Sequence, residues 1–307
     1  MLTRVDLRNC SCCPRQCHAD RAGSKLGFCE SGTDFSISSI CCHHGEEPVL
    51  SGKHGICNIF FSHCNMQCLF CQNYQISDNR TGIAAGNMTL DDITAQVESI
   101  LSGGAIGVGF VSPSHFIPQM RQIMNSLNKK EHNPVYVYNT NGYDKPEMIA
   151  SMESEIDVYL PDMKYMDNSL AGKYSATPDY TDFACASLKE MFRQKGADLA
   201  LNKDGMVTAG LIIRHLVLPG HVDNSKRVLR FIAEELSPDA HVSLMSQYYP
   251  TPRVARHPNL GRTLYQHEYE EVLDEFENLG FWRGFVQELS SPHHYRPDFL
   301  KDHPFEN

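Results

Sequence analysis

The sequence lacks the features of membrane-bound, secreted and nucleic-acid-binding proteins. It has no apolar run approaching 18 residues, and its start, MLTRVDLRNC, does not show the charged, apolar and small-residue order of a signal peptide. The formal net charge of −10 offers no basic excess to displace counterions from nucleic acid, and no polybasic segment would bind anionic lipid. We therefore expect a soluble cytoplasmic protein with no nucleic-acid or membrane partner.

Cysteine, by contrast, is abundant and unevenly placed. Eleven of the 12 cysteines lie within the first 71 residues, and Cys185 stands alone beyond them. Thiols of a cytoplasmic chain are expected to stay reduced, which argues against a disulfide framework. Structural buried cysteines would be scattered along the chain, whereas crowding at one end indicates ligands of a metal or a cluster.

Short apolar runs alternate with amphipathic stretches from about residue 57 onward, which is typical of βα units. This order predicts an α/β fold with a parallel sheet, and an incomplete TIM-like barrel fits it better than a closed eight-fold one. We expect a cysteine-rich extension over 1–50, the barrel over 51–290 and a tail over 291–307. The predicted strands cover 57–62, 106–111, 135–139, 156–160, 211–217, 241–247 and 281–288, and the predicted helices cover 89–101, 115–127, 147–152, 179–195, 224–235 and 267–279.

One loop carries three cysteines directly after the first predicted strand. Cys64, Cys68 and Cys71 have C-x3-C-x2-C spacing, and parallel barrels place their chemistry on loops that follow the strands. Three thiolates can bind three irons of a cubane 4Fe-4S cluster and leave the fourth free for the amino and carboxylate groups of a methionine. A zinc knuckle supplies two x2-spaced pairs and a ferredoxin repeats C-x2-C-x2-C, so both alternatives fit less well.

At this motif the sequence resembles the radical S-adenosylmethionine (SAM) superfamily, and over nearly its whole length it resembles proteins related to pyruvate formate-lyase activating enzyme. The resemblance rests on residues 60–77, 139–143, 160–164, 213–220 and 243–250. It implies a partial (β/α)6 barrel that binds a 4Fe-4S cluster and SAM and takes an electron from a donor such as flavodoxin or ferredoxin. Reductive cleavage of SAM then gives methionine and a 5′-deoxyadenosyl radical that abstracts hydrogen from a substrate.

The same resemblance implies contacts with the bound cofactor. Phe70 matches the aromatic residue that packs near the adenine. Ser112 and Ser114 lie where the family contacts the methionine amino group, although Ser114 could instead cap the next helix. Asn139 and Asn141 end the third predicted strand, where the activating enzymes carry an Asp and an Asn. We therefore expect these strand ends to hold the methionine and the ribose.

Two further strand ends carry charged residues. Asp162 and Lys164 match the Asp-x-Lys of the activating enzymes and are expected to contact the cofactor, with a surface pair as the alternative. Arg214 lies in an apolar run, where a charged side chain is costly unless it is paired. We expect Arg214 to point into the barrel and bind a carboxylate, and a structural salt bridge is the competing interpretation.

The amino-terminal segment carries a second set of four thiols. Cys10, Cys13, Cys17 and Cys29 lie in a stretch with few apolar positions, so a bound metal would be its natural stabiliser. Spacing does not separate zinc from an auxiliary iron–sulfur cluster, and full cysteine ligation indicates a structural or electron-relaying role. Activating enzymes that have a second site carry it after the catalytic triplet, whereas these cysteines precede it.

Three functions therefore remain open at this point. The chain is expected to activate a glycyl-radical enzyme by abstracting hydrogen from a glycine of that partner, or to modify a small molecule or peptide. The third alternative is a non-catalytic iron–sulfur or zinc protein that transfers electrons or binds a partner. An activase predicts an open barrel mouth, a small-molecule enzyme predicts a lidded pocket, and the non-catalytic protein predicts a cluster indifferent to SAM.

Overall fold

One twisted sheet runs through the computed structural model, which describes residues 5–23, 25–80, 82, 86, 88–130, 132–289, 296–301 and 303–305. Its strand order in the described part is β1-β2-β3-β4-β5-β7-β8-β9, with the short β6 paired to β7. All neighbours from β2 to β9 on this path are parallel, and β1 is antiparallel to β2. The strands are β1 (Ile37–His43), β2 (Ile56–Phe61), β3 (Gly107–Val111), β4 (Val135–Thr140), β5 (Val158–Pro161), β6 (Ala200–Leu201), β7 (Val207–Leu216), β8 (His241–Met245) and β9 (Gly284–Val286).

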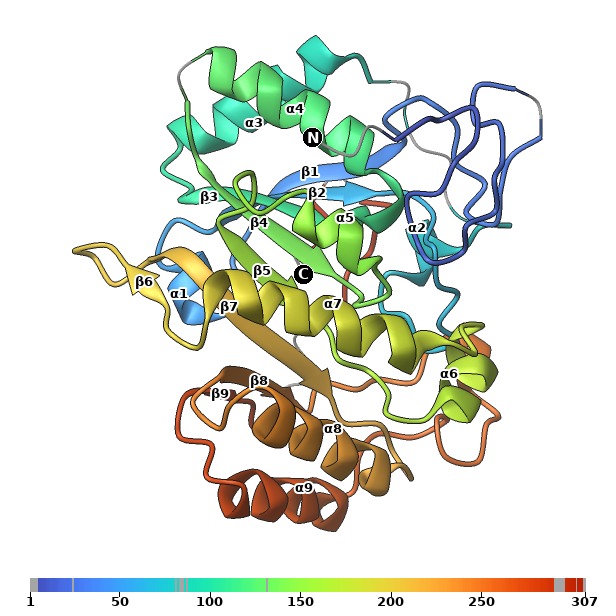
Figure 1. Cartoon of the computed structure of the whole chain (residues 1–307), viewed down its shortest axis with the longest axis vertical. Coiled ribbons are helices and arrows are strands. Elements are labelled where there is room, and N and C mark those ends of the chain that lie inside the picture. Colours follow the sequence, from blue (N-terminus) through green and yellow to red (C-terminus); the bar gives the residue numbers. More distant parts are fainter. Residues whose placement is uncertain are drawn as a thin grey trace.

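Helices follow each of the first six parallel strands, so the chain forms six βα units before β9 (Figure 1). β1 and β9 form the two ends of the strand order, and the described sheet does not close into a complete barrel. This confirms the predicted partial (β/α)6 barrel. The α-helices are α1 (Pro48–Ser51), α2 (Tyr74–Ser77), α3 (Leu90–Ser102), α4 (Ile117–Lys129), α5 (Pro146–Ala150), α6 (Asn168–Ser175), α7 (Tyr180–Lys195), α8 (Val222–Glu235) and α9 (Gln266–Asn278), with 3-10 turns at Pro113–His115 and Pro252–Val254.

Local chemistry explains why these elements form where they do. Every residue of β2, β3 and β5 is buried, as expected for parallel strands that are covered on both faces. Thr89 and Asp92 form a reciprocal capping box at the start of α3. Pro118 lies in the first turn of α4, where its missing N–H breaks no helical hydrogen bond. The predicted strands and long helices are thus all present, with ends shifted by a few residues.

The amino-terminal segment was only partly anticipated. Residues 37–43, which the sequence analysis placed in a cysteine-rich extension, form β1 and pair with β2 from Ile37↔Phe61 to His43↔Ile56. Residues 5–23 and 25–36 contain no helix or strand, and they lie beside α2 and the loop after β2 (Figure 1). Residues 291–295, 302, 306 and 307 of the predicted tail lie outside the described residues.

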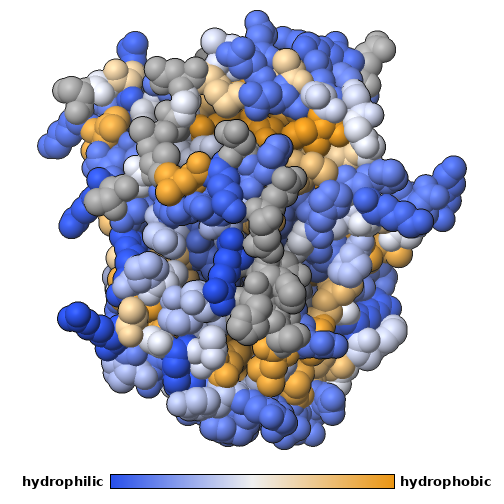
Figure 2. Space-filling model, turned by 180° about the vertical axis from the view of Figure 1, so that it is seen from behind, coloured by the Kyte–Doolittle hydropathy of each residue, from blue (hydrophilic) through white to orange (hydrophobic). Residues whose placement is uncertain are grey.

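The surface is mainly hydrophilic on the face opposite to that of Figure 1, with apolar side chains gathered in smaller patches (Figure 2). No helix in the described part of the chain has both the length and the apolar character needed to span a membrane. The large apolar side chains that are exposed among the described residues are Phe28, Leu201, Tyr265, Trp282, Val286 and Leu300.

Candidate functional site

The loop between β2 and α2 carries the cysteine triplet at the carboxyl end of the sheet. It has no regular secondary structure of its own, so side chains and neighbouring backbone fix its course. The Cys64 amide donates to Asn79 Oδ1 at 3.0 Å, and Asn79 Nδ2 donates back to the Cys64 carbonyl at 3.0 Å. Further along, the amides of Gln67 and Leu69 donate to the carbonyls of Ser175 and Tyr174 at the end of α6.

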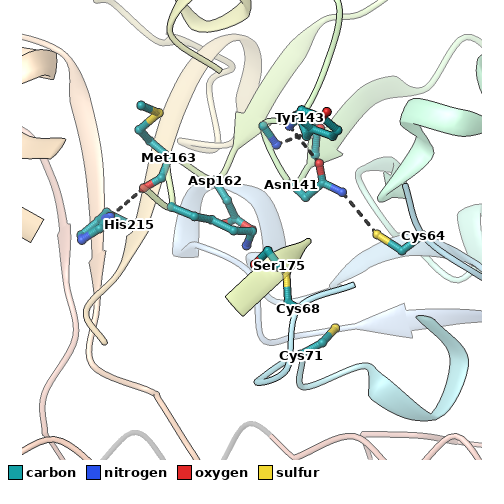
Figure 3. Close-up of polar contacts among 12 residues, drawn as sticks. Cys64, Cys68, Cys71, Asn141, Tyr143, Asp162, Met163, Ser175 and His215 are labelled. Atoms are coloured by element: carbon teal, nitrogen blue, oxygen red, sulfur yellow. Dashed lines mark hydrogen bonds and ion pairs between the residues drawn. The ribbon is translucent and has the colours of Figure 1, made fainter. Parts of the chain in front are cut away.

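Each sulfur of the triplet accepts a hydrogen bond. Asn141 Nδ2 lies 3.4 Å from Cys64 Sγ and points toward it (Figure 3). The Ser175 hydroxyl donates to Cys68 Sγ at 3.0 Å, and the Ser77 hydroxyl donates to Cys71 Sγ at 3.3 Å. Donors aimed at sulfur favour the thiolate form, which is the form that binds iron.

When no metal is bound, burial favours the neutral thiol over the thiolate. It raises the pKa of Cys64 far above the ordinary value of a thiol. Burial also raises the pKa of Cys68 to about 11, although the nearby Lys164 ammonium opposes this shift. Metal binding requires thiolates, so loading this site must release protons.

A single ion and a cluster differ in how closely they draw their thiolate ligands together. No three His, Cys, Asp or Glu side chains of the described chain are grouped around one ion-sized point. A tetrahedral zinc with Zn–S bonds of about 2.3 Å would draw its sulfurs to ~3.8 Å from one another. In a cubane cluster each thiolate binds a different iron, so its ligands stay further apart. Three cysteine ligands on one loop would leave one iron of such a cluster without a protein ligand.

Two neighbouring strand ends place polar groups beside the triplet. Ser112 follows β3 in the left-handed conformation (φ 54°), and its amide donates to the Asn139 carbonyl at 2.8 Å. Asn139 lies in β4, and Asn141 follows that strand; all three residues line the main cavity. Asn141 also donates to Asn65 Oδ1 at 2.8 Å, which links β4 to the cysteine loop.

Ser114 is placed differently from Ser112. Its side chain is fully buried and lies 3.2 Å from Thr140 Oγ1, and Ser114 is not among the residues that line the cavity. It does not cap α4 either, because the N-cap is Phe116 and no side chain caps that helix. The hydroxyl belongs to a buried network in which Thr140 and Tyr138 donate to the Asp144 carboxylate.

The acid–base pair after β5 faces the same cavity. Lys164 Nζ lies 2.5 Å from Asp162 Oδ2, and both side chains are largely buried, so this is not the surface pair considered from sequence. Although burial opposes its charge, Asp162 holds the pKa of Lys164 above the ordinary value. Phe70 lines the cavity as well and packs against Tyr248 with ring centroids 6.0 Å apart.

Arg214 points into the barrel from β7, where its guanidinium meets two carboxylates. It donates to Glu47 Oε1 at 2.8 Å and Oε2 at 2.6 Å, and it also contacts Glu46. Burial opposes ionisation of Glu46, yet the Arg214 charge holds the pKa of this carboxyl below its ordinary value. The salt-bridge interpretation of Arg214 is therefore the observed one.

The main cavity, of about 610 Å³, extends from the cysteine loop into the barrel. Glu46 and Glu47 also line it and were not predicted from sequence, because they follow β1 and no motif marks them. His63 was not predicted either; its buried Nδ1 has no hydrogen-bond partner among the described residues. The predicted site residues that line this cavity are Cys64, Cys68, Phe70, Cys71, Ser112, Asn139, Asn141, Asp162, Lys164 and Arg214.

Fold and site together define an open α/β barrel that presents three cysteine thiols at the carboxyl end of its parallel strands. The family model of the radical SAM superfamily matches residues 58–232. This span is more than half of the 307 residues, and the chain belongs to the radical SAM superfamily. Membership implies a radical-generating enzyme with a 4Fe-4S cluster and SAM as cofactors.

One individual relative of this chain is uncharacterised, and two solved structures resemble it only at low sequence identity. An uncharacterised protein of Methanocaldococcus jannaschii is 30% identical over 271 residues, which are 87% of this chain and 74% of that protein. A domain of pyruvate-formate lyase-activating enzyme from Bacteroides vulgatus is 13% identical with a TM-score of 0.41, over 59% of this chain and 99% of that one. The FeFe-hydrogenase maturase HydG from Carboxydothermus hydrogenoformans is 10% identical with a TM-score of 0.49, over 79% of this chain and 61% of that one.

Proposed function

We propose that this protein reductively cleaves SAM at a 4Fe-4S cluster held by Cys64, Cys68 and Cys71, and that the resulting 5′-deoxyadenosyl radical abstracts hydrogen from a substrate. The observation that carries the proposal is the triplet itself. Its three thiols come from one short loop, each accepts a hydrogen bond, and all three open into one cavity. Three protein ligands leave one iron of a cubane free to bind the amino acid end of SAM.

The cavity residues supply complementary groups for that cofactor. Ser112, Asn139 and Asn141 present hydroxyl and amide groups at two adjacent strand ends, which suit the methionine and ribose of SAM. His63 adds a buried ring nitrogen that has no partner in the described chain, as expected where a bound molecule completes the hydrogen bonding. Phe70 offers an apolar face for the adenine. These side chains bind and orient the cofactor and exclude water from it.

For the substrate, we propose an activase-like role in which the hydrogen comes from a glycine of a partner protein. A cavity of about 610 Å³ falls within the roughly 300–1,000 Å³ that holds one cofactor-sized ligand. A glycine of a partner's loop can bring its α-carbon close to the reacting end of SAM, because glycine has no side chain. One observation favours the alternative of a small molecule or peptide: Pro297 and Phe305 of the carboxyl-terminal tail line the same cavity and partly cover it.

The first test is SAM cleavage by the full chain. After anaerobic reconstitution with iron and sulfide, dithionite and SAM should yield 5′-deoxyadenosine. The Cys64/Cys68/Cys71→Ala variant should yield none, and Cys185→Ala, which removes a thiol outside the site, should match the parent. A protein that carries its cluster and gives no 5′-deoxyadenosine would refute catalysis and leave electron transfer or binding as the function.

The second test separates the two substrate classes. A short peptide with a central α-deuterated glycine is added to the reconstituted protein, and the 5′-deoxyadenosine is analysed for deuterium. Deuterium from this peptide, and none from the same peptide with α-deuterated alanine at that position, would support the activase-like role. If neither peptide transfers deuterium although SAM is cleaved, the small-molecule alternative becomes the better one.

A further inference from the structure

The cysteines of the amino-terminal segment meet at a second, smaller cavity. Backbone hydrogen bonds of 3.0 Å join Cys10 to His18 and Ala19, which brings the ends of the first loop together. A Cβ atom built on Gly27 would lie 2.4 Å from Cys17 Sγ, so the chain passes that sulfur more closely than any other residue type would allow. The cavity is lined by Cys10, Cys12, Cys13, Arg15, Gln16, Cys17, Phe28, Cys29 and His115.

This convergence needs a cause other than hydrophobic packing. Residues 5–23 and 25–36 contain no helix or strand, yet Cys10, Cys13 and Cys29 are all at least 93% buried. A segment with so little regular structure and apolar surface is ordinarily held by a cross-link or a metal. The cysteines of this segment are free thiols in the structure, so a metal is the remaining candidate.

A buried cation beside the thiols indicates that the bound group is negatively charged. The Arg21 side chain is 3% exposed, donates to the carbonyls of Ser31, Gly32 and His115, and forms no ion pair with a carboxylate of the described chain. Its Nη2 is buried without a hydrogen-bond partner there. Arg21 lies within electrostatic reach of Cys10, and an unpaired buried charge is costly. Thiolates bound to a metal centre would provide the missing negative charge.

Four thiolates suit either a zinc ion or an iron–sulfur cluster. A zinc ion would draw four sulfurs to ~3.8 Å from one another around one point. No such grouping exists among the described residues, and the same is true of Cys64, Cys68 and Cys71, where the family implies a 4Fe-4S cluster. The family implies that this chain is loaded with iron and sulfide at the triplet, so the same inorganic components are at hand for the amino-terminal thiols.

Hydrogen bonds tie this segment to the catalytic loop at two points. Arg15, between Cys13 and Cys17 in the chain, donates to the Asn65 carbonyl at 2.9 Å and lies 3.7 Å over the Phe28 ring. Asn79 Nδ2 donates to the Phe28 carbonyl at 2.8 Å. The same side chain also hydrogen-bonds to both the amide and the carbonyl of Cys64. Any group that orders the amino-terminal segment therefore also orders the loop that carries the triplet.

We propose that Cys10, Cys13, Cys17 and Cys29 hold a second iron–sulfur cluster, fully ligated by protein, that anchors the loop of the catalytic triplet. Full ligation leaves no open iron, so this cluster is structural and does not bind SAM. The proposal stands apart from the proposed SAM cleavage, because it concerns iron that remains when the triplet has been removed.

The test uses the full-length Cys64/Cys68/Cys71→Ala variant, reconstituted anaerobically with iron, sulfide and zinc all present. We expect iron and acid-labile sulfide in equal amounts, about two to four of each per chain. Adding Cys13→Ala and Cys29→Ala should abolish this iron, and adding Cys185→Ala should leave it unchanged. Zinc in place of iron, or no metal in the triple variant, would overturn the assignment.

A second variant tests the anchoring role even if the loss of Cys13 and Cys29 prevents folding. Arg15→Met removes the hydrogen bond to Asn65 and leaves all thiols in place. In the otherwise native protein we expect unchanged total iron but at least a several-fold faster loss of the triplet's iron to a chelator. An unchanged rate would overturn the anchoring role.

Discussion

Replacing Arg214 by methionine would leave Glu46 and Glu47 in the barrel without the guanidinium that now lies between them. The side chains of Arg214, Glu46 and Glu47 are 12%, 8% and 4% exposed, so water compensates little for the lost partner. Removing one member of a buried ion pair costs about 3–5 kcal/mol, because the remaining charge is left uncompensated. We expect R214M to lower the free energy of unfolding by about this amount.

Scanning calorimetry would show this loss as a lower melting temperature. The entropy of unfolding is about 2.1 cal/mol/K per residue, or ~0.64 kcal/mol/K for 307 residues, so 3–5 kcal/mol corresponds to about 5–8 °C. The matched control is the triple variant Glu46→Gln/Glu47→Gln/Arg214→Met. It removes the carboxylate charges together with the cation, so it should recover most of the loss.

The alternative role for Arg214 makes the opposite prediction. If Arg214 served to bind a substrate carboxylate, removing its guanidinium would weaken substrate binding but leave the free energy of unfolding almost unchanged. A melting temperature of R214M within about 2 °C of the parent would therefore refute the reasoning from the salt bridge.

Three further variants test the electrostatics of the site and of the core. Lys164→Met removes the cation near Cys68 and should lower the midpoint potential of the reconstituted cluster in a redox titration, because a nearby positive charge favours the more negative, reduced form. Asn141→Leu removes the hydrogen bond to Cys64 Sγ and should reduce the iron retained after gel filtration. Burial lowers the pKa of His215 to about 4, so its neutral form contributes stability that is complete above about pH 6.5 and is lost as the pH falls toward 4. Between pH 7 and pH 5 the parent should therefore lose about 2 kcal/mol more of its free energy of unfolding than the His215→Gln variant does. Urea unfolding midpoints at the two pH values would measure this difference.

The barrel was predictable because its signals are local. The run at 57–62 is mainly apolar and is followed by the cysteine loop, and Thr89 with Asp92 marks the start of a helix by itself. β1 was missed because ISSICCH alternates weakly and its strand state depends on pairing with β2. Its antiparallel course also sets the position of Glu46, which no local pattern could reveal.

The residues of the candidate site were likewise predictable from sequence only in part. The triplet was found from its spacing and its place after a predicted strand, and Asn141 and Lys164 from the resemblance to the activating enzymes. The partner of Arg214 was not predictable, because Glu47 is 167 residues away in the chain and reaches the barrel only through the turn after β1. Ser114 shows the reverse case: its position after β3 indicated a ligand or a cap, but tertiary packing directs its hydroxyl toward Thr140 instead.

The catalytic loop is held from both sides by segments that lie far from it in the chain. The amino-terminal segment contacts it through Arg15, which donates to the Asn65 carbonyl, and through Phe28, whose carbonyl accepts from Asn79. From the carboxyl-terminal tail, Asp298 accepts a hydrogen bond from Gln75 Nε2 at 3.0 Å, and the Phe299 amide donates to Gln75 Oε1 at 2.8 Å, directly after the triplet. An irregular loop has a large conformational entropy, and a cluster needs its three thiolates in fixed positions. Because both segments restrain the loop, less of that entropy remains to be lost when the triplet binds its cluster.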